Sequence, residues 1–498
     1  MEEALNGALD ESTAHGASRV RSAVLCVDLD GTLLKTDTLY ETLLAALKAR
    51  PRIILQLPFW LARGRHHLKQ ALAREVHGSL NPSSWPRQAE VELLIAEAKS
   101  SGKTVELISA ADQTHICDLP LFRQMFDEVI GSSDGLNLKG EAKARLLRER
   151  HPDGFAYVGD SAADLPVWRA ATERFGVNVP PSVRRRAARE GIDLVELVPA
   201  HSALPGLIKS MRPHQWLKNL LVLVPLVLLG PRAELSDVFT FLCGFLLFGL
   251  LTSGTYVLND IFDVESDRKH PRKRLRPIAS GNLPFPLAAV AAVGLIAVAL
   301  AGSLFLNATF AWTLLAYLAL TLSYSLFLKR IPLVDVLAIA SLFTLRIVAG
   351  MTLVGLPPSE WLLIFSIFFF FSLALMKREV ELGVMGKTGA QVLQGRGYAI
   401  EDRTLLLCFG AASGVASLVV FALFISSMME QPSSPYATPQ LLWGAMAALS
   451  YWIMRMWLLT VRGLMDDDPI LYAARERASL ILAGLIAAFV LAAQLVHL

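Results

Sequence analysis

Three aspartates stand at the end of a long apolar run, directly before a basic segment. Asp260, Asp263 and Asp267 share one helical face with Tyr256 and Asn259 at about 100° per residue. Clustered carboxylates repel unless a cation holds them, and hard oxygen ligands suit Mg²⁺ bound to a phosphorylated substrate. The basic residues that follow could neutralise other phosphate oxygens: Arg268, Lys273, Arg274 and Arg276. A solvated helix end before a positively charged loop is the structural alternative.

The string around these acids resembles a known family. Asn259-Asp260-x-x-Asp263-x-x-x-Asp267 is similar to the first aspartate-rich motif of the UbiA family of intramembrane transferases. Its continuation, Arg268-x-His270-Pro271-x-Lys273-Arg274-x-Arg276-Pro277-Ile278-Ala279, resembles the decaprenyl-phosphate phosphoribosyltransferases within that family. The resemblance implies a Mg²⁺-dependent enzyme that uses phosphoribosyl pyrophosphate and a polyprenyl phosphate lipid.

A second set of acids begins near the N-terminus. Asp28 and Asp30 end the apolar run 23–27, which reads as a buried parallel strand. Further runs at 104–109, 155–160, 175–179 and 193–198 alternate with helical patterns, so a mostly parallel α/β sheet is expected. The ends of such strands place side chains at one edge. The insert 38–87 has a helical pattern and should cap that edge.

These motifs resemble those of the haloacid dehalogenase (HAD) phosphohydrolases. The resemblance makes Asp28 the nucleophile and Asp30 the general acid/base, while Ser109 would bind phosphate and Lys143 would offset charge. Its Mg²⁺ ligands would be Asp28, Asp160 and Asp164. Lys139 competes for the lysine role, although the resemblance favours Lys143. A fold retained only as a scaffold is the alternative.

The chain as a whole divides into two physically different parts. Charged and apolar residues mix up to about residue 210, and long apolar runs dominate afterwards. We expect a polar leader (1–22), a HAD-like domain (23–198), a linker (199–211) and a transmembrane transferase domain (212–498). The leader has no apolar segment typical of a cleavable signal. A net charge of +3 does not indicate nucleic-acid binding, and the four cysteines have no metal-ligand or disulfide spacing.

Nine apolar runs are long enough to suggest membrane spans, and nine is also the number in the UbiA family. They lie near 217–231, 236–258, 284–304, 306–328, 332–354, 360–377, 404–426, 438–460 and 478–497. Lys and Arg gather in alternate connections, which the positive-inside rule assigns to the cytoplasm. We therefore expect a multi-pass inner (cytoplasmic) membrane protein whose N-terminal domain and polar motifs share the cytoplasmic side.

Several charged residues accompany these runs and are further candidates for substrate binding. Asp335 and Arg346 lie eleven residues apart, about 16 Å along a helix, so each needs a partner elsewhere. The segment 377–382 departs from the second aspartate-rich motif of many UbiA prenyltransferases, and this departure matches the phosphoribosyltransferase subgroup. Asp466 to Asp468 are interpreted as a solvated turn. The candidate binding residues here are Arg212, Lys218, Lys329, Arg346, Lys377, Arg378 and Glu381.

The combined expectation is a glycosyltransferase that joins ribose 5-phosphate to a polyprenyl phosphate, with a HAD domain that removes the 5-phosphate from the product. One rival is an aromatic prenyltransferase of the wider family, which a second aspartate-rich motif would favour. Another is a membrane protein whose HAD-like part only recruits partners. The sequence leaves the lipid's chain length and the formation of a homo-oligomer open.

Overall fold

The computed structural model describes residues 19–76, 82–117, 119–133, 137–357, 359–387, 396–431, 434–465 and 468–497. The chain forms two compact units. The first runs to Ser210 and also includes Asp260–Ala289, and the second comprises Met211–Asn259 with Val290–Leu498. Residues 1–18 of the predicted leader lie outside the described residues.

The first unit is built on a six-stranded sheet in which every pair of neighbouring strands is parallel. The strand order is β3-β2-β1-β4-β5-β6. The strands are β1 (Val24–Val27), β2 (Thr104–Asp112), β3 (Glu128–Ser132), β4 (Ala156–Gly159), β5 (Glu173–Val177) and β6 (Val195–Val198). Because β1 lies between β2 and β4, the chain reverses direction across the sheet at this point, where open α/β sheets bind ligands.

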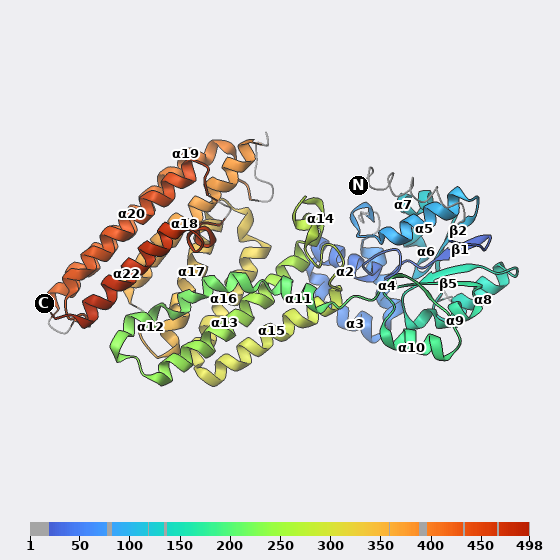
Figure 1. The fold of residues 1–498 in the computed structure, drawn as a ribbon, viewed down its shortest axis with the longest axis horizontal. Helices are drawn as coiled ribbons and strands as arrows, with labels where there is room; N and C mark the ends of the chain where they lie inside the picture. Colours follow the sequence, from blue (N-terminus) through green and yellow to red (C-terminus); the bar gives the residue numbers. More distant parts are fainter. Residues whose placement is uncertain are drawn as a thin grey trace. The chain divides into compact units, whose positions relative to one another are not determined.

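Helices cover both faces of this sheet (Figure 1). One apolar core includes residues of α5 (Ala89–Ser100), α6 (Gln113–Cys117) and α7 (Pro120–Met125). A second core includes residues of α8 (Glu141–Arg150), α9 (Leu165–Ala170) and α10 (Pro181–Arg189). Strands buried on both sides must be apolar throughout, which explains the continuous hydrophobic runs in the sequence.

The predicted helical cap is also present. It consists of α2 (Thr38–Ala49), η1 (Pro51–Leu55), α3 (Leu57–Ala62), α4 (Arg65–Glu75) and η2 (Pro82–Ser84). Asp37 caps α2, because its side chain accepts a hydrogen bond from the Leu39 backbone N–H. The predicted α/β fold of the N-terminal part, with its helical cap, is therefore confirmed.

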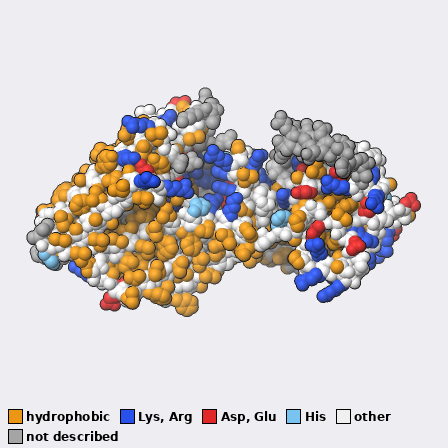
Figure 2. Space-filling view, in the orientation of Figure 1, with side chains coloured by type: hydrophobic (Ala, Val, Ile, Leu, Met, Phe, Trp, Pro, Cys, Tyr) orange, Lys and Arg blue, Asp and Glu red, His pale blue; other side chains and the backbone are white. Residues whose placement is uncertain are grey.

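Eight helices in the described residues are long and apolar enough to cross a membrane. They are α13 (Leu235–Phe262), α15 (Phe285–Leu306), α16 (Ala308–Leu326), α17 (Val334–Leu353), α18 (Glu360–Lys387), α19 (Arg403–Glu430), α20 (Leu442–Val461) and α22 (Arg477–Leu495). Hydrophobic side chains spread over much of the bundle's visible surface (Figure 2), and Phe305 and Trp312 are among the exposed ones. An apolar exterior of this size fits a lipid environment. The protein is thus a multi-pass integral membrane protein.

The predicted span at 217–231 is not among these eight candidates. This segment forms η4 (Pro213–Leu223), α12 (Val224–Leu229) and η5 (Gly230–Arg232), so 3₁₀ and α-helical geometry alternate along it. The segment also packs closely on α17, since a Cβ at Gly350 would lie 2.1 Å from the Val222 carbonyl oxygen.

The prediction that one helix carries all three aspartates of the motif is wrong. Helix α13 ends at Phe262, Asp263 is the N-cap position of α14 (Val264–Lys269), and η6 (Lys273–Leu275) follows. The Asp263 side chain makes no capping hydrogen bond to α14. The remaining elements are α11 (Leu204–Met211), η3 (Ala162–Asp164), η7 (Leu328–Arg330), η8 (Ile400–Asp402), η9 (Pro439–Leu441) and α21 (Pro469–Ala473).

Candidate active sites

The acids predicted for phosphatase chemistry gather at the carboxyl edge of the sheet. Asp28 directly follows β1, Asp160 follows β4, and Asp164 ends η3. One carboxylate oxygen from each of these three residues lies within 4.8 Å of the other two. Carboxylate oxygens are the ligands that Mg²⁺ prefers, so this set fits the ion chemically.

A buried lysine stands among these carboxylates. Lys143 Nζ lies 2.8 Å from Asp28 Oδ1 and 3.9 Å from Asp164 Oδ1, and its side chain is 4 % exposed. Burial alone would lower the lysine's pKa, but Asp28 and Asp164 raise it, so the group stays protonated. Of the two candidate lysines, the structure places Lys143 against Asp28.

Tyr157 is a member of this cluster that the sequence reasoning missed. Its hydroxyl donates to Asp164 Oδ1 at 2.6 Å and accepts from Lys143 Nζ at 3.1 Å. The Ser161 backbone N–H and hydroxyl hold the other oxygen of Asp164, each at 3.0 Å. Asp164 is therefore oriented before any ligand arrives. The sequence signal that could have identified Tyr157 is a polar hydroxyl within an otherwise apolar strand.

Asp30 is held by the first residue of the cap. The Thr38 backbone N–H donates to Asp30 Oδ1 at 2.8 Å, and the Thr38 hydroxyl donates to Oδ2 at 3.0 Å. Burial, reinforced by Asp37, raises the pKa of Asp30 to about 7. A carboxyl group with such a pKa can donate and accept a proton near neutral pH, as a general acid/base must.

Gly31 permits the close approach of two of these loops. It has a φ of +80°, and a Cβ at this position would lie 2.2 Å from Asp160 Oδ2. Any larger residue would displace the carboxylate of Asp160 or strain the backbone. Ser109, the expected phosphate ligand, is fully buried on β2, and its hydroxyl accepts from the Ala111 backbone N–H at 3.0 Å.

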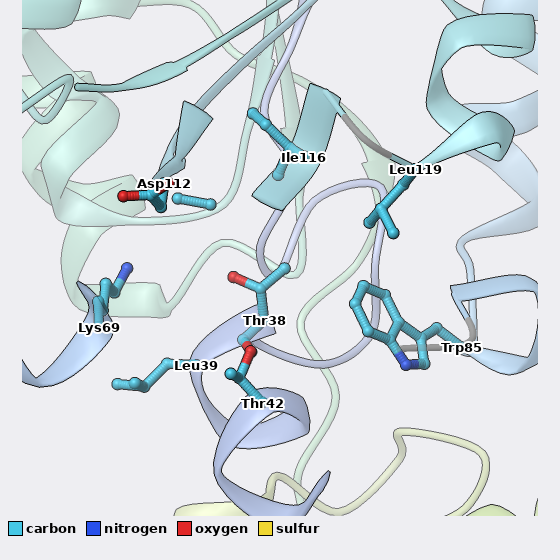
Figure 3. Close-up of a pocket in the computed structure, with 9 residues that line it drawn as sticks. Thr38, Leu39, Thr42, Lys69, Trp85, Asp112, Ile116 and Leu119 are labelled. Carbon is cyan, nitrogen blue, oxygen red and sulfur yellow. The ribbon is translucent and has the colours of Figure 1, made fainter. Parts of the chain in front are cut away.

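A small cavity of about 20 Å³ lies between the cap and the end of β2 (Figure 3). Thr38 and Thr42 of α2 and Lys69 of α4 form one side, and Asp112 and Ile116 form another. Its volume is sufficient for about one water molecule and too small for an organic substrate.

The acids of the aspartate-rich motif are arranged differently. Arg276 Nη1 lies 3.1 Å from Asp260 Oδ1 and 2.6 Å from Asp267 Oδ2. In the described part of the chain, the motif acids are not among the groups whose oxygens converge within 4.8 Å. The break at Asp263 explains this spread. Burial raises the pKa of Asp267, although Arg276 opposes the shift.

The basic residues that follow the motif have different environments. Both guanidinium nitrogens of Arg268 bind Glu41 of the cap, at 2.8 and 2.7 Å, and both side chains are nearly buried. Lys273 and Arg274 are exposed. Arg268 is therefore already neutralised by a carboxylate, whereas Lys273 and Arg274 remain open to solvent.

In the second unit, Arg346 is a buried cation surrounded by neutral groups. Its side chain donates to Asn219 Oδ1 at 3.1 Å, to the Tyr317 hydroxyl at 2.8 Å and to the Leu342 carbonyl at 2.8 Å. It forms no ion pair with a carboxylate in the described residues. A buried positive charge without a counter-ion favours an anionic ligand nearby.

Asp335 and Arg378, by contrast, form an ion pair with each other. Arg378 Nε lies 2.7 Å from Asp335 Oδ2, and its Nη1 lies 2.5 Å from Glu381 Oε2. Tyr398 also donates to Asp335. Arg378 is fully buried, so its guanidinium joins α17 and α18 through charge and hydrogen bonds.

Asp468 is not the solvated turn that was predicted. It lies 2.5 Å from Lys218 Nζ and 3.9 Å from Lys377 Nζ, and it caps α21. Burial raises the pKa of Asp468, but the two lysines outweigh this effect and lower it. Asp466 and Asp467 lie outside the described residues.

Three other predicted residues have separate surroundings. Arg212 has a left-handed φ of 52°, and its guanidinium lies 5.1 Å from the centre of the Tyr256 ring. Asn259 Oδ1 is buried without a hydrogen-bond partner among the described residues. Lys329 is half-buried in η7.

Comparisons with known proteins cover both units. Residues 220–472 match the model of the UbiA prenyltransferase family. The chain is 40% identical to the uncharacterized protein y4nM of Sinorhizobium fredii, over 95% of this chain and 91% of that protein. It is 38% identical to the decaprenyl-phosphate phosphoribosyltransferase of Mycobacterium tuberculosis (strain H37Rv), over 44% of this chain and 76% of the relative. A solved UbiA homolog from Archaeoglobus fulgidus bound to GPP and Mg²⁺ matches 58% of this chain and 100% of its own, with 17% identity and a TM-score of 0.45.

Proposed function

Because the chain belongs to the UbiA prenyltransferase family, we propose that it is a membrane transferase that moves 5-phosphoribosyl from phosphoribosyl pyrophosphate to a polyprenyl phosphate. Partial similarity to a decaprenyl-phosphate phosphoribosyltransferase supports this choice of donor and acceptor. The bond from ribose C1 to the diphosphate breaks, an oxygen of the lipid phosphate bonds to C1, and inorganic pyrophosphate leaves.

The observation that carries the proposal is the environment of residues 377–382. Many prenyltransferases of the family have a second acidic motif here, whereas this chain has Lys377, Arg378 and Glu381. Arg378 is bound between Asp335 and Glu381, so these acids are already engaged by a cation. This arrangement disfavours a second metal cluster around a prenyl diphosphate, and it argues against the aromatic prenyltransferase alternative.

The residues of the first motif act on the leaving diphosphate. Bound Mg²⁺ would neutralise the charge that the diphosphate gains as the C1–O bond breaks. Asp260, Asp263 and Asp267 would supply oxygen ligands for it, and Asn259 presents a buried oxygen without a partner in the described residues, next to Asp260 on α13. The lipid phosphate is already anionic, so no strong general base is required.

Cations would hold the remaining phosphate oxygens. Arg346 is suited to this role because its buried charge has neutral partners. Of the other predicted cations, Lys218, Arg268 and Arg378 are already paired with carboxylates. Lys273 and Arg274 are exposed and are the better candidates for this role.

The HAD-like unit would then remove the 5-phosphate from the lipid-linked product. Asp28 attacks phosphorus, Asp30 protonates the departing 5-hydroxyl, and water later releases inorganic phosphate from the phosphoaspartate. Lys143 offsets the negative charge of the incoming phosphate, and Ser109 contacts it. The intact set of Asp28, Lys143, Asp160 and Asp164 supports activity over a purely structural role.

The location follows from the charge pattern of the connections. Lys and Arg are concentrated in alternate loops, which favours a cytoplasmic N-terminal domain on an inner-membrane protein. A cytoplasmic site would have direct access to the water-soluble donor.

The test is reconstitution of the purified full chain in vesicles with Mg²⁺ and labelled phosphoribosyl pyrophosphate. One reaction contains polyprenyl phosphate, and a second replaces donor and acceptor by a prenyl diphosphate and an aromatic acid. We expect label in the lipid in the first reaction and no prenylated acid in the second. The Asp260→Asn variant should lose transfer, while Glu265→Gln, an exposed acid on α14, should retain it. Normal transfer by Asp260→Asn would refute the proposal.

A further inference from the structure

The phosphatase-like acids open into a large cavity that lies entirely within the first unit. It has a volume of about 1080 Å³, and Asp30 and Asp160 line one part of it. Pockets for drug-sized ligands occupy roughly 300–1,000 Å³. A phosphorylated pentose alone is smaller than such ligands, so the cavity has room for a larger substrate.

One wall of the cavity comes from the segment 275–286, which lies more than a hundred residues after the last HAD-like motif. This wall is tightly packed. A Cβ at Gly281 would lie 2.4 Å from Lys35 Cβ, and a Cβ at Gly206 would lie 3.4 Å from the Asn282 carbonyl oxygen. The Tyr40 and Phe285 rings stack with their centres 5.2 Å apart. The wall is therefore part of the fold of the first unit.

Two lysines in the cavity have charges that the protein does not neutralise. Lys35 and Lys209 both line it, and neither forms an ion pair with a described residue. By contrast, Arg268 in the same lining is bound to Glu41. Two ammonium groups that line the same cavity without an ion-pair partner in the described residues are available to an anionic portion of a substrate.

The same cavity also has an apolar portion. Leu275, Pro284 and Phe285 line it, and Phe285 is the first residue of the candidate span α15. A water-soluble sugar phosphate would gain nothing from these side chains. An isoprenoid chain would bury them and gain hydrophobic free energy.

We propose that this cavity selects a lipid-linked substrate with two phosphates. The terminal phosphomonoester would bind at Asp28 and Asp160, and the phosphodiester that joins the sugar to the lipid would bind Lys35 and Lys209. The first isoprene units would contact Leu275 and Phe285. This inference rests on the proposed function and identifies Lys35 and Lys209 as specificity-determining residues.

The test compares two substrates in the full-length protein: lipid-linked phosphoribose in vesicles, and p-nitrophenyl phosphate, which has one phosphate and no lipid. Released phosphate is measured for Lys35→Ala, Lys209→Ala and Lys209→Arg. We expect each alanine variant to lower kcat/KM for the lipid substrate about tenfold or more relative to p-nitrophenyl phosphate, mainly through KM. Lys209→Arg should recover part of the loss. Lys48→Ala, an exposed lysine outside the cavity lining, is the matched control.

The outcomes separate this inference from the proposed function. If the wild-type protein hydrolyses lipid-linked phosphoribose but the alanine variants leave the substrate ratio unchanged, the second phosphate site is refuted and the proposed function stands. If the wild-type protein hydrolyses only p-nitrophenyl phosphate, both the proposed phosphatase step and this inference are wrong. Activity on p-nitrophenyl phosphate also shows that each variant is folded.

Discussion

Each of the two acidic clusters of the first unit contains a cation that offsets the repulsion between its carboxylates, and the two cations differ in burial. At the sheet edge, Lys143 is 4 % exposed and is fixed between Asp28 and Asp164. In the aspartate-rich motif, Arg276 is 29 % exposed and binds Asp260 and Asp267 from the short element that follows α14. The first cluster already has metal-ligand spacing. The second does not have it in the described residues, where Arg276 lies between Asp260 and Asp267.

The largest expected effect is that a variant of either cluster loses one reaction, phosphate release or phosphoribosyl transfer, and keeps the other. Asp28→Asn should lower phosphate release on the order of 10⁴-fold or more, because it removes the nucleophile, and lipid-linked phosphoribose should accumulate. Asp263→Asn should abolish transfer while hydrolysis of supplied lipid-linked phosphoribose continues. Thin-layer separation of labelled lipids distinguishes the two products. Loss of both activities in either variant would mean that the clusters do not act separately.

The two cations should differ in importance. Lys143→Met should reduce phosphatase activity by roughly 10²–10³-fold, since a preorganised charge is lost next to the transferred phosphate. Arg276→Met should reduce transfer by only about tenfold, because the half-exposed guanidinium contributes less to binding. Initial rates at saturating Mg²⁺ measure both. Equal losses of activity in the two variants would contradict the expectation that the buried cation contributes more than the half-exposed one.

Two ion pairs between α2 and α14 extend the comparison to stability. The Glu41–Arg268 pair is about 5 % exposed, whereas Lys48 and Glu265 are 36 % and 50 % exposed. Glu41→Gln should destabilise the contact by about 3–5 kcal/mol, because it leaves a buried charge without its partner. Lys48→Ala should change it by less than about 1 kcal/mol. Hydrogen exchange of the α2 and α14 backbone amides would reveal both, and similar protection in the two variants would contradict this account.

The smallest expected effect concerns the turn that packs against Lys35. Gly281 has a φ of +77°, and a side chain there would meet the Lys35 backbone. Gly281→Ala should therefore cost about 1–3 kcal/mol of local stability. Gly294→Ala is a suitable control, because a Cβ there has open space and alanine favours a helix. Exchange rates of the 277–283 amides measure the difference, and unchanged rates for Gly281→Ala would show that the turn tolerates the displacement.

The sequence was most informative where strand ends and apolar runs set the positions of residues. Asp28 and Asp160 meet because parallel strands deliver them to one edge of the sheet, and Lys143 reaches them from α8. Strand β3 was missed because its Glu-Val-Ile-Gly-Ser sequence has only two consecutive apolar residues. The sequence also did not reveal which aspartates stand at helix ends. Asp263 ends a helix and Asp468 caps one, and neither role is visible in hydrophobic periodicity.

Partners that are distant in sequence could not be predicted either. The spacing showed only that Asp335 and Arg346 could not pair with each other. Which of the other charges each would meet depended on the packing of α17 and α18, and the structure assigns Asp335 to Arg378. The bond from Tyr157 on β4 to Asp164 at the end of η3 also belongs to no motif that the sequence displays.

The first unit is assembled from two separate stretches of chain, residues up to Ser210 and Asp260–Ala289. Its gene segment therefore cannot be excised with a single cut in the 199–211 region without removing part of its own interior. A truncated N-terminal fragment would leave Tyr40 without its stacking ring and Glu41 without its guanidinium. A fragment that keeps this unit intact must therefore include both stretches of chain.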